Sequence, residues 1–218
     1  MQDTLKTQVK AGQITNLTDA RYFAARGASW LGFQLDAGGA GQVSPQMFSA
    51  IKEWVEGPLF VGTFGASTAA EINETVNLLN LDMIQVGLFS GLDDLKQIKT
   101  IPVIKEIVVQ EPSDLTHLEQ ELEAYNTFVD SFLLDFGKNG INWEMLEAQP
   151  EILALLSKFC KNFRIILSIV SKPEQTIEII DKLNPLGFNF VGGDEEKVGF
   201  KSFEDLDKIF DLLEIEEE

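Results

Sequence analysis

An aspartate that directly follows an apolar run is the strongest candidate catalytic residue of this sequence. In the segment "FLLDFG", Asp135 comes after three apolar residues, an arrangement typical of the end of a buried strand. A carboxyl group that loses water there has a raised pKa, which suits a general acid. Two other roles stay open for Asp135: capping of a loop and pairing with a lysine.

A glycine pair offers a second kind of chemistry. In "VGGDEE", the N–H groups of Gly192 and Gly193 could hold a phosphate, because glycine lets the backbone approach an anion closely. Three acidic residues follow at once, which argues against an anion and favours a plain turn. The loop "AGGAGQ" contains no lysine or arginine and is a poor anion clamp.

The composition limits the class of partner. Against 35 Asp and Glu stand 17 Lys and Arg, which gives a net charge of −18 over 218 residues. Such a surface repels nucleic acid and anionic membrane, so we expect neither as a partner, and a small molecule is the favoured ligand. No apolar run approaches the length of a membrane span. The start of the sequence, "MQDTLKTQ", does not resemble a signal peptide.

Cysteine and histidine are too few for several common sites. Cys160 is the only cysteine, which excludes an intrachain disulfide, and its apolar helical surroundings predict a buried, inert thiol. His117 is the only histidine and falls on a polar helical face. We therefore expect no metal site, no cofactor and a cytoplasmic location. Walker, dinucleotide-binding and nucleophile-elbow motifs are absent from the sequence.

These residues need a scaffold, and the sequence predicts one by alternation. Short apolar runs rich in β-branched residues alternate with amphipathic runs that start at N-cap signals, such as Ser44 followed by Pro45. Eight strands are expected, starting near residues 7, 30, 59, 83, 103, 131, 164 and 188.

Eight strand–helix units imply a parallel sheet with right-handed crossovers. An open doubly wound sheet and a closed barrel both have this pattern. The count of eight favours the α/β class with a (β/α)8 TIM barrel of eight parallel strands and eight outer helices. No linker divides the chain, so residues 1–218 are expected to form a single barrel domain.

In such a barrel the reacting groups come from the carboxyl ends of the strands. This rule selects a short set of candidates from the whole chain. They are Gly12, Gln13, Asp36, Gln85, Asp135, Gly192 and Gly193.

The sequence also resembles a known family, the phosphoribosylanthranilate isomerases of tryptophan biosynthesis. The segment "VKAGQITNLTDARYFAARGASWLGFQL" is similar to the family's opening K-[IV]-C-G-[IL]-T motif and the helix and strand that follow it. "VSPQ", "LDMIQV", "FLLDFG", "SKPEQTIEII" and "VGGDEEKVGFKS" are similar to later family segments. The resemblance covers nearly the whole chain.

The resemblance implies a (β/α)8 barrel that carries out an Amadori rearrangement, converting an N-linked aminoaldose into an aminoketose without a cofactor. It implies that the general acid is Asp135. The family's general base, a cysteine, falls on Gly12, which cannot take a proton.

Other family positions are replaced as well. The glycine after the base becomes Gln13, and the arginine that binds the anthranilate carboxylate falls on Gly41. A histidine becomes Gly87, and phosphate-binding glycines fall on Ile169 and Val170, whose branched side chains crowd the position that phosphate must approach.

Two functional hypotheses follow. The first is a barrel that has diverged from the family's activity and binds or acts on an unidentified small molecule, such as a phosphosugar, at Asp135, Gln85, Gly192, Gly193, Gln13 and Asp36. The second is a functional isomerase with a relocated general base, for which Asp36 on the second strand is a candidate. The sequence leaves open whether the protein is a monomer or a homodimer.

Overall fold

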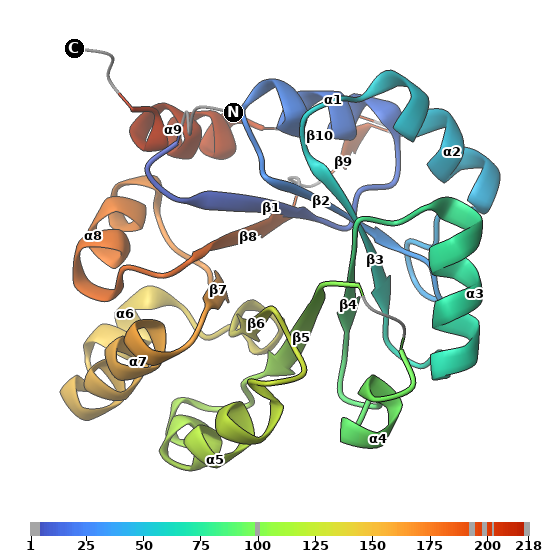
Figure 1. Ribbon diagram of the computed structural model, residues 1–218. Coiled ribbons are helices and arrows are strands. Elements are labelled where there is room, and N and C mark those ends of the chain that lie inside the picture. Colours follow the sequence, from blue (N-terminus) through green and yellow to red (C-terminus); the bar gives the residue numbers. More distant parts are fainter. Residues whose placement is uncertain (1–4, 99–100, 192–194, 198–199, 202, 216–218) are drawn as a thin grey trace.

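The computed structural model describes residues 5–98, 101–191, 195–197, 200–201 and 203–215 (Figure 1). Within them, eight strands pair in parallel, each with the next, and β1 pairs with β8 to close a barrel. The (β/α)8 expectation is thereby confirmed. The strands are β1 (Gln8–Gly12), β2 (Trp30–Gln34), β3 (Leu59–Phe64), β4 (Met83–Val86), β5 (Val103–Val108), β6 (Ser131–Asp135), β7 (Ile165–Ser168) and β8 (Gly187–Val191).

Helices surround the strands on the outside (Figure 1). The described part of the chain contains nine α-helices rather than the expected eight, because the connection between β6 and β7 contains two. They are α1 (Leu17–Ala25), α2 (Pro45–Trp54), α3 (Ala69–Leu79), α4 (Leu92–Leu95), α5 (Leu115–Tyr125), α6 (Trp143–Glu147), α7 (Pro150–Asn162), α8 (Pro173–Leu183) and α9 (Glu204–Leu213).

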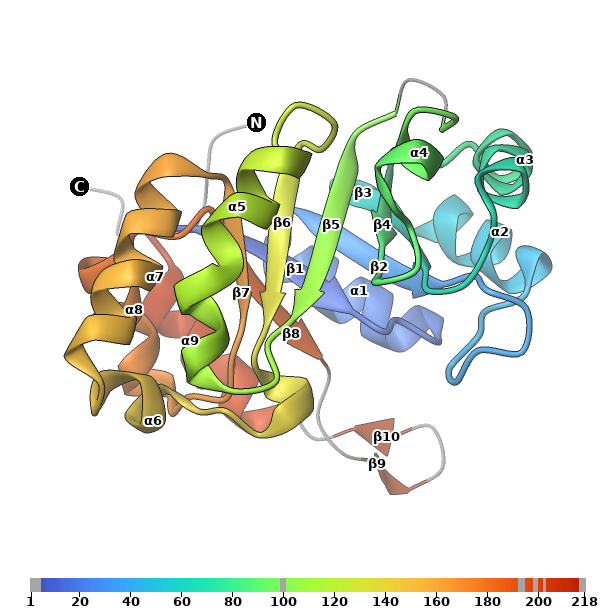
Figure 2. The same ribbon diagram turned by 90° about the horizontal axis from the view of Figure 1, so that it is seen from below.

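An additional antiparallel pair of short strands follows β8. β9 (Glu195–Lys197) pairs with β10 (Phe200–Lys201), and the pair lies beyond the carboxyl ends of the barrel strands (Figure 2). The alternation of apolar and amphipathic runs gives no signal for this pair, because its strands are only two and three residues long.

The helix starts follow the side chains that reach free N–H groups. Ser44 accepts a hydrogen bond from the N–H of Met47, as its N-cap position before Pro45 predicts. Asn16 caps α1. Thr68 caps α3 in a reciprocal capping box, while the neighbouring Ser67 donates to the Asp36 carboxylate.

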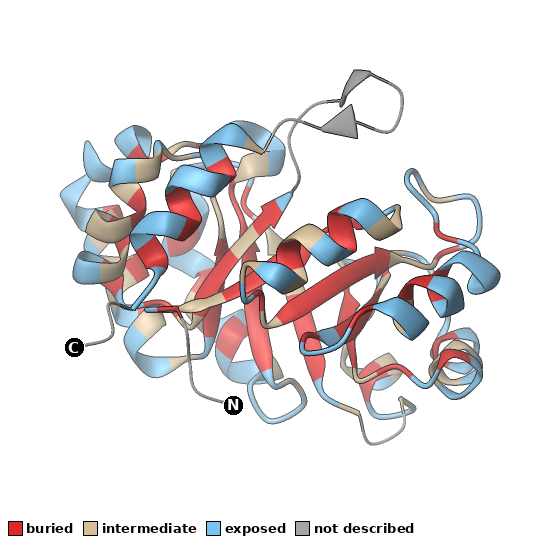
Figure 3. Cartoon of the chain, turned by 90° about the horizontal axis from the view of Figure 1, so that it is seen from above, coloured by how far each residue is buried: buried red, intermediate tan, exposed pale blue. Residues whose placement is uncertain are grey.

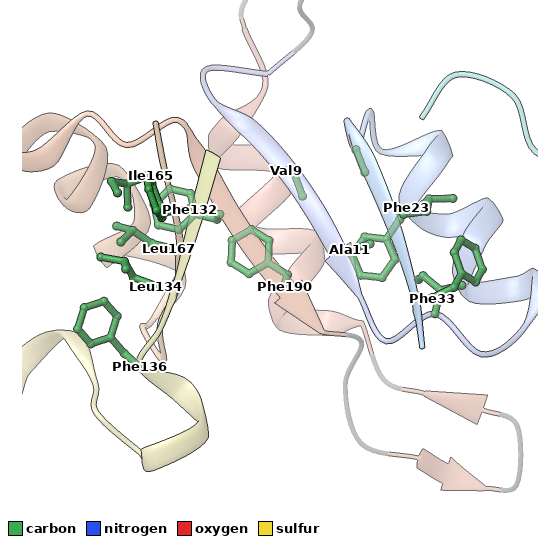
Figure 4. Packing of buried hydrophobic residues seen from close by; sticks show 14 of the residues in the cluster. Val9, Ala11, Phe23, Phe33, Phe132, Leu134, Phe136, Ile165, Leu167 and Phe190 are labelled. Carbon is green, nitrogen blue, oxygen red and sulfur yellow. The ribbon is translucent and has the colours of Figure 1, made fainter. Parts of the chain in front are cut away.

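The larger apolar core lies between the barrel and the helices. Strands are mostly buried, whereas each helix buries one face and exposes the other (Figure 3). Phe23 of α1 and Phe33 of β2 belong to this layer (Figure 4), and the Phe33 ring packs edge-on against that of Phe48 at 5.0 Å between centroids.

The barrel interior has two tiers. A separate apolar cluster fills its lower part, formed by Trp30, Val61, Met83, Ile104, Leu133 and Ile166. Because side chains alternate between the two faces of a strand, the residue two positions further on also points inward, nearer the carboxyl end. On five strands that residue is polar: Thr63, Gln85, Glu106, Asp135 and Ser168. The apolar tier thus forms the floor beneath a polar upper tier.

Closure of the barrel requires close approach of β1 and β8. Gly187 is the partner of Gln8 in the ladder, and a β-carbon at Gly187 would lie only 2.4 Å from the Gln8 carbonyl oxygen. A backbone atom cannot move aside cheaply, so this position accepts glycine alone.

We expect Gly187→Ala to lower the free energy of unfolding by roughly 2 kcal/mol or more, because it overpacks the closing ladder. Urea unfolding followed by circular dichroism measures this. The matched control is Gly87→Ala, where a β-carbon would meet nothing nearer than 3.7 Å, and we expect a change within about 0.5 kcal/mol. Equal effects of the two variants would contradict this account of closure.

Candidate active site at the carboxyl ends of the strands

A cavity of about 570 Å³ opens at the carboxyl ends of the strands. Four of the residues expected at the site line it together, namely Gly12, Gln13, Gln85 and Asp135. Ile169 and Val170, on which the family's phosphate-binding glycines fall, line it as well. Gly192 and Gly193 lie outside the described residues.

Asp135 is buried, with 6% of its surface exposed, and is held by its own loop. Its Oδ1 accepts a hydrogen bond from the backbone N–H of Lys138 at 3.0 Å, and the Lys138 ammonium lies 3.6 Å from Oδ2. The two alternatives left open by the sequence, loop capping and pairing with a lysine, are therefore both present. Despite these two contacts, Asp135 still lines the cavity.

A second carboxylate, Glu106 of β5, links Asp135 to Gln85. Glu106 accepts hydrogen bonds from Gln85 Nε2 at 3.0 Å and from Lys138 Nζ. Burial acts to lower the pKa of Lys138, but its hydrogen bond to Glu106 and the negative charges of Glu106 and Asp135 outweigh burial and raise that pKa. Gln85 Oε1 is buried without a hydrogen-bond partner among the described residues, and a ligand could use it.

Lys10 is a further candidate, which was not expected from the sequence. This residue lies in the middle of β1, is only 2% exposed and lines the cavity. Its Nζ donates to Asn189 Oδ1 at 3.0 Å, and Asn189 Nδ2 donates to Ser168 Oγ at 3.3 Å. A signal was available, because a lysine inside the apolar strand "QVKAG" must be buried on one face or the other.

Burial shifts the protonation of Lys10. Removal from water lowers the pKa of its ammonium from 10.5 to about 8; the charges of Glu106 and Asp135 act in the opposite direction, and that of Lys138 adds to the lowering. About a tenth of Lys10 is therefore neutral at pH 7 and half at pH 8. A neutral amine in a cavity is both a base and a nucleophile.

Glycines make room for this amine. A β-carbon at Gly32 would lie 2.9 Å from Lys10 Nζ, and one at Gly12 would lie 2.9 Å from Asn189 Oδ1. The next residue, Gln13, has φ 54°, in the left-handed region that favours glycine. The turn after β1 thus keeps a backbone suited to the family's glycine although glutamine now occupies the position.

Asp36, the expected relocated base, has a different environment. It is not among the residues that line the cavity. Its carboxylate accepts hydrogen bonds from Gln34 Nε2 and from the N–H groups of residues 65–67. Burial acts to raise the pKa of Asp36, but these bonds and that from the Ser67 hydroxyl hold it below its usual value. Asp36 therefore orders the loop after β3, and accepting a proton would weaken these bonds.

The positions of the lost family side chains are open. Gly41 has φ 71° in the loop after β2, and a β-carbon there would meet only Thr15, at 3.8 Å. Gly87 follows β4 with similar free space. A β-carbon at Gly87 would meet backbone atoms of Phe64 and Gly65, and Lys105 Nζ contacts the Gly87 carbonyl oxygen.

A larger concavity, of about 1370 Å³, lies at the amino ends of the strands, with Gln8, Ser29 and Pro185 among its lining residues. None of the expected site residues lines it. The bottom face of such barrels serves stability, whereas catalysis takes place at the carboxyl ends. The smaller cavity is therefore the candidate active site.

Comparison with known proteins agrees with this geometry. The family model of N-(5'-phosphoribosyl)anthranilate (PRA) isomerase matches residues 9–212. The chain belongs to the PRA isomerase family. The PRA isomerase of Trichormus variabilis is 28% identical over 222 residues, covering 95% of this chain and 97% of that protein.

Solved PRA isomerases share the fold. That of Thermus thermophilus superimposes with a TM-score of 0.74 at 27% identity, covering 94% of this chain and 97% of the other. A PRA isomerase in complex with reduced 1-(o-carboxyphenylamino)-1-deoxyribulose 5-phosphate has a TM-score of 0.73 at 24% identity, covering 94% and 96%. The family resemblance read from the motifs is thus confirmed.

The single cysteine of this PRA isomerase relative can now be compared with the expectation of an inert thiol. Burial raises the pKa of the Cys160 thiol to about 12, which agrees with an inert side chain. In the part of the chain that the structure describes, no helix is long and apolar enough to cross a membrane. The same residues contain no group of three or more His, Cys, Asp or Glu that could hold a metal ion.

The buried ammonium of Lys10 predicts a pH-dependent stability. Because the folded-state pKa is lowered, the unfolded chain binds more protons between pH 8 and 10.5, and stability rises with pH across that window. Each tenfold change in proton affinity is worth about 1.4 kcal/mol, so Lys10→Met should gain roughly 3 kcal/mol at pH 7. The gain should vanish near pH 10.5, as measured by urea unfolding at a series of pH values.

The control for this series is Lys161→Met, at an exposed position. We expect it to change stability by less than about 0.5 kcal/mol at every pH. A gain for Lys10→Met that stays constant from pH 7 to 10.5 would show that the methionine packs better and that no charge cost was relieved.

Proposed function

We propose that this protein catalyses the family's Amadori rearrangement of N-(5'-phosphoribosyl)anthranilate, with Asp135 as general acid and Lys10 as relocated general base. The observation that carries the proposal is that both side chains line one cavity, and that Lys10 lies two residues before Gly12, where the cysteine of the family motif is expected. The matching family and its relatives' names support the same reaction.

The rearrangement needs a general acid that donates a proton and a general base that accepts one. Opening of the aminoaldose ring requires a proton on the ring oxygen, which Asp135 would supply as general acid. The open-chain iminium then loses its C2 proton to a base, and the enamine formed tautomerises to the aminoketose. The neutral Lys10 amine has a pKa close to the working pH, which is the condition under which a general base is most effective.

Other residues of the cavity suit a phosphosugar in part. The unpartnered Gln85 Oε1 could accept a hydrogen bond from a sugar hydroxyl, and Gln13 could donate one from the rim. Lys138 brings a positive charge to the mouth, although Glu106 and Asp135 share it. Phosphate binding at Gly192 and Gly193 stays a prediction from the sequence.

A second candidate is the diverged barrel that acts on another small molecule. Ile169 and Val170 favour it, since both line the cavity where glycines would admit a phosphate, and Val170 is 56% exposed. Gly41 replaces the arginine that would bind the anthranilate carboxylate, which also favours the second candidate. We propose this as the alternative because the same cavity would bind a ligand without a carboxylate or phosphate.

The setting of either function is proposed on the same grounds. A single domain over residues 1–218, a monomer or homodimer, and action in the cytoplasm are consistent with the unbroken barrel, the acidic composition and the one inert cysteine. We propose that no cofactor takes part, because the acid and the base suffice for the rearrangement.

An isomerase assay on the purified protein tests the proposal. We expect turnover with N-(5'-phosphoribosyl)anthranilate that falls about 10²–10⁴-fold in Asp135→Asn and in Lys10→Met, with Lys161→Met as the unaffected control. The ratio of wild-type kcat/KM to that of Lys10→Met should rise with pH and level off above pH 8, because only the neutral Lys10 amine acts as a base. Wild-type protein without turnover would favour the second candidate.

A rescue variant tests the position of the base. In the Lys10→Met background, Gly12→Cys places a thiol at the end of β1, and we expect it to recover at least tenfold of the lost activity, because a nearby thiolate can take the same proton. Asn189 must rotate, since a β-carbon at Gly12 would lie 2.9 Å from its Oδ1. Gly12→Ser is the control, and no recovery with either residue would place the base elsewhere.

A further inference from the structure

We propose that the Lys10 amine forms a reversible imine with short hydroxylated aldehydes and ketones, making the barrel a carbonyl-binding protein through a covalent bond. This activity goes beyond isomerisation of the family's substrate and does not depend on it. The same chemistry would serve an open-chain sugar that carries neither anthranilate nor phosphate.

The position of Lys10 supports an attack on a carbonyl carbon. Lys10 lines the cavity, and among the described residues its Nζ donates a hydrogen bond to Asn189 Oδ1, at 3.0 Å. That bond leaves the nitrogen lone pair of the neutral amine free. Gly32 has no side chain to crowd the nitrogen, whereas a β-carbon there would lie only 2.9 Å from Nζ.

Comparison with Lys105 shows why Lys10 is the buried lysine suited to imine formation. Both lysines are 2% exposed, and burial lowers the pKa of both. Lys105 Nζ donates to the carbonyl oxygens of Gly87 and Ser90 and lies 5.1 Å from the centre of the Tyr125 ring. It does not line the cavity, so no carbonyl compound reaches it.

The charges around Lys10 favour a neutral ligand. The cavity mouth contains two ammonium groups, Lys10 and Lys138, and two carboxylates, Glu106 and Asp135. Lys138 is already paired with both carboxylates, so among the residues that the structure describes no free cation remains for an anionic ligand beside the neutral Lys10 amine. Gln85 Oε1 offers a buried acceptor for a hydroxyl group, which points to hydroxylated carbonyl compounds.

The covalent step balances without an added reactant. The lone pair of the neutral nitrogen forms a C–N bond with the carbonyl carbon, and the π electrons move to oxygen, which takes a proton from nitrogen. The carbinolamine then loses its hydroxyl with the second nitrogen proton as water, leaving the C=N bond. Asp135, which lines the same cavity, is placed to give the departing hydroxyl a proton and to receive one back from nitrogen.

Reductive trapping tests the inference on the wild-type protein. Dihydroxyacetone and sodium cyanoborohydride at pH 7 convert each imine to a stable secondary amine, which peptide mass spectrometry locates. The neutral fraction of Lys10 is about 300-fold that of an ordinary lysine at pH 7. We expect Lys10 to be labelled at least tenfold faster than the exposed Lys161, and Lys105 to stay unlabelled.

Two variants sharpen the result. Gly32→Ala keeps Lys10 but crowds its nitrogen, and we expect it to slow labelling of Lys10 at least tenfold while labelling of Lys161 is unchanged. Lys10→Met should abolish the fast phase. Labelling of Lys10 at the rate of Lys161, or fast labelling that Gly32→Ala leaves unaltered, would overturn the inference.

The isomerase assay separates this inference from the proposed function. Fast trapping at Lys10 in a protein without isomerase turnover supports the imine and rejects the proposed function. Turnover with no trapping at Lys10 rejects the imine and leaves Lys10 as a base alone. Both results together show one amine in two roles.

Discussion

Closing eight strands into a barrel forces every second side chain into a space without solvent, and this constraint shapes the whole site. In the lower part of the barrel the interior side chains are apolar and pack as one cluster that includes Val61, Ile104 and Leu133. Two residues further along, the side chains of five strands are polar, because that tier borders the open mouth. The apolar tier and the polar upper tier thus result from one alternating pattern of side chains.

The polar tier is stable because its charges are matched. Glu106 and Asp135 share the ammonium of Lys138, and Lys10 contributes the fourth charge. Lys10 is the least compensated member, since it has a neutral amide as its hydrogen-bond partner and lies furthest from solvent. The fold therefore holds a lysine at a free-energy cost, and such strained protonation is typical of functional sites.

The turn after β1 shows how a scaffold can keep a geometry after its side chains change. Gln13 adopts φ 54° although it is not glycine, and Gly12 leaves free the position that a reactive side chain would fill. Asn189 occupies part of that space and holds the Lys10 amine. Lys10, two residues before Gly12, lies at the next inward-facing position of β1.

The architecture can be predicted from the sequence, because a buried strand and an amphipathic helix each have a period that can be read locally. The sequence predicts the eight strands, the N-cap at Ser44, the family and the convergence of Asp135, Gln85 and Gly12 at one end. Tertiary structure decided what depends on neighbours distant in sequence. Only the closed barrel shows that Lys10 points inward and donates to Asn189. It also shows that Asp36 is hydrogen-bonded to the loop after β3. The proton affinity of each group depends on burial and on hydrogen bonds between strands, which a local stretch of sequence does not contain.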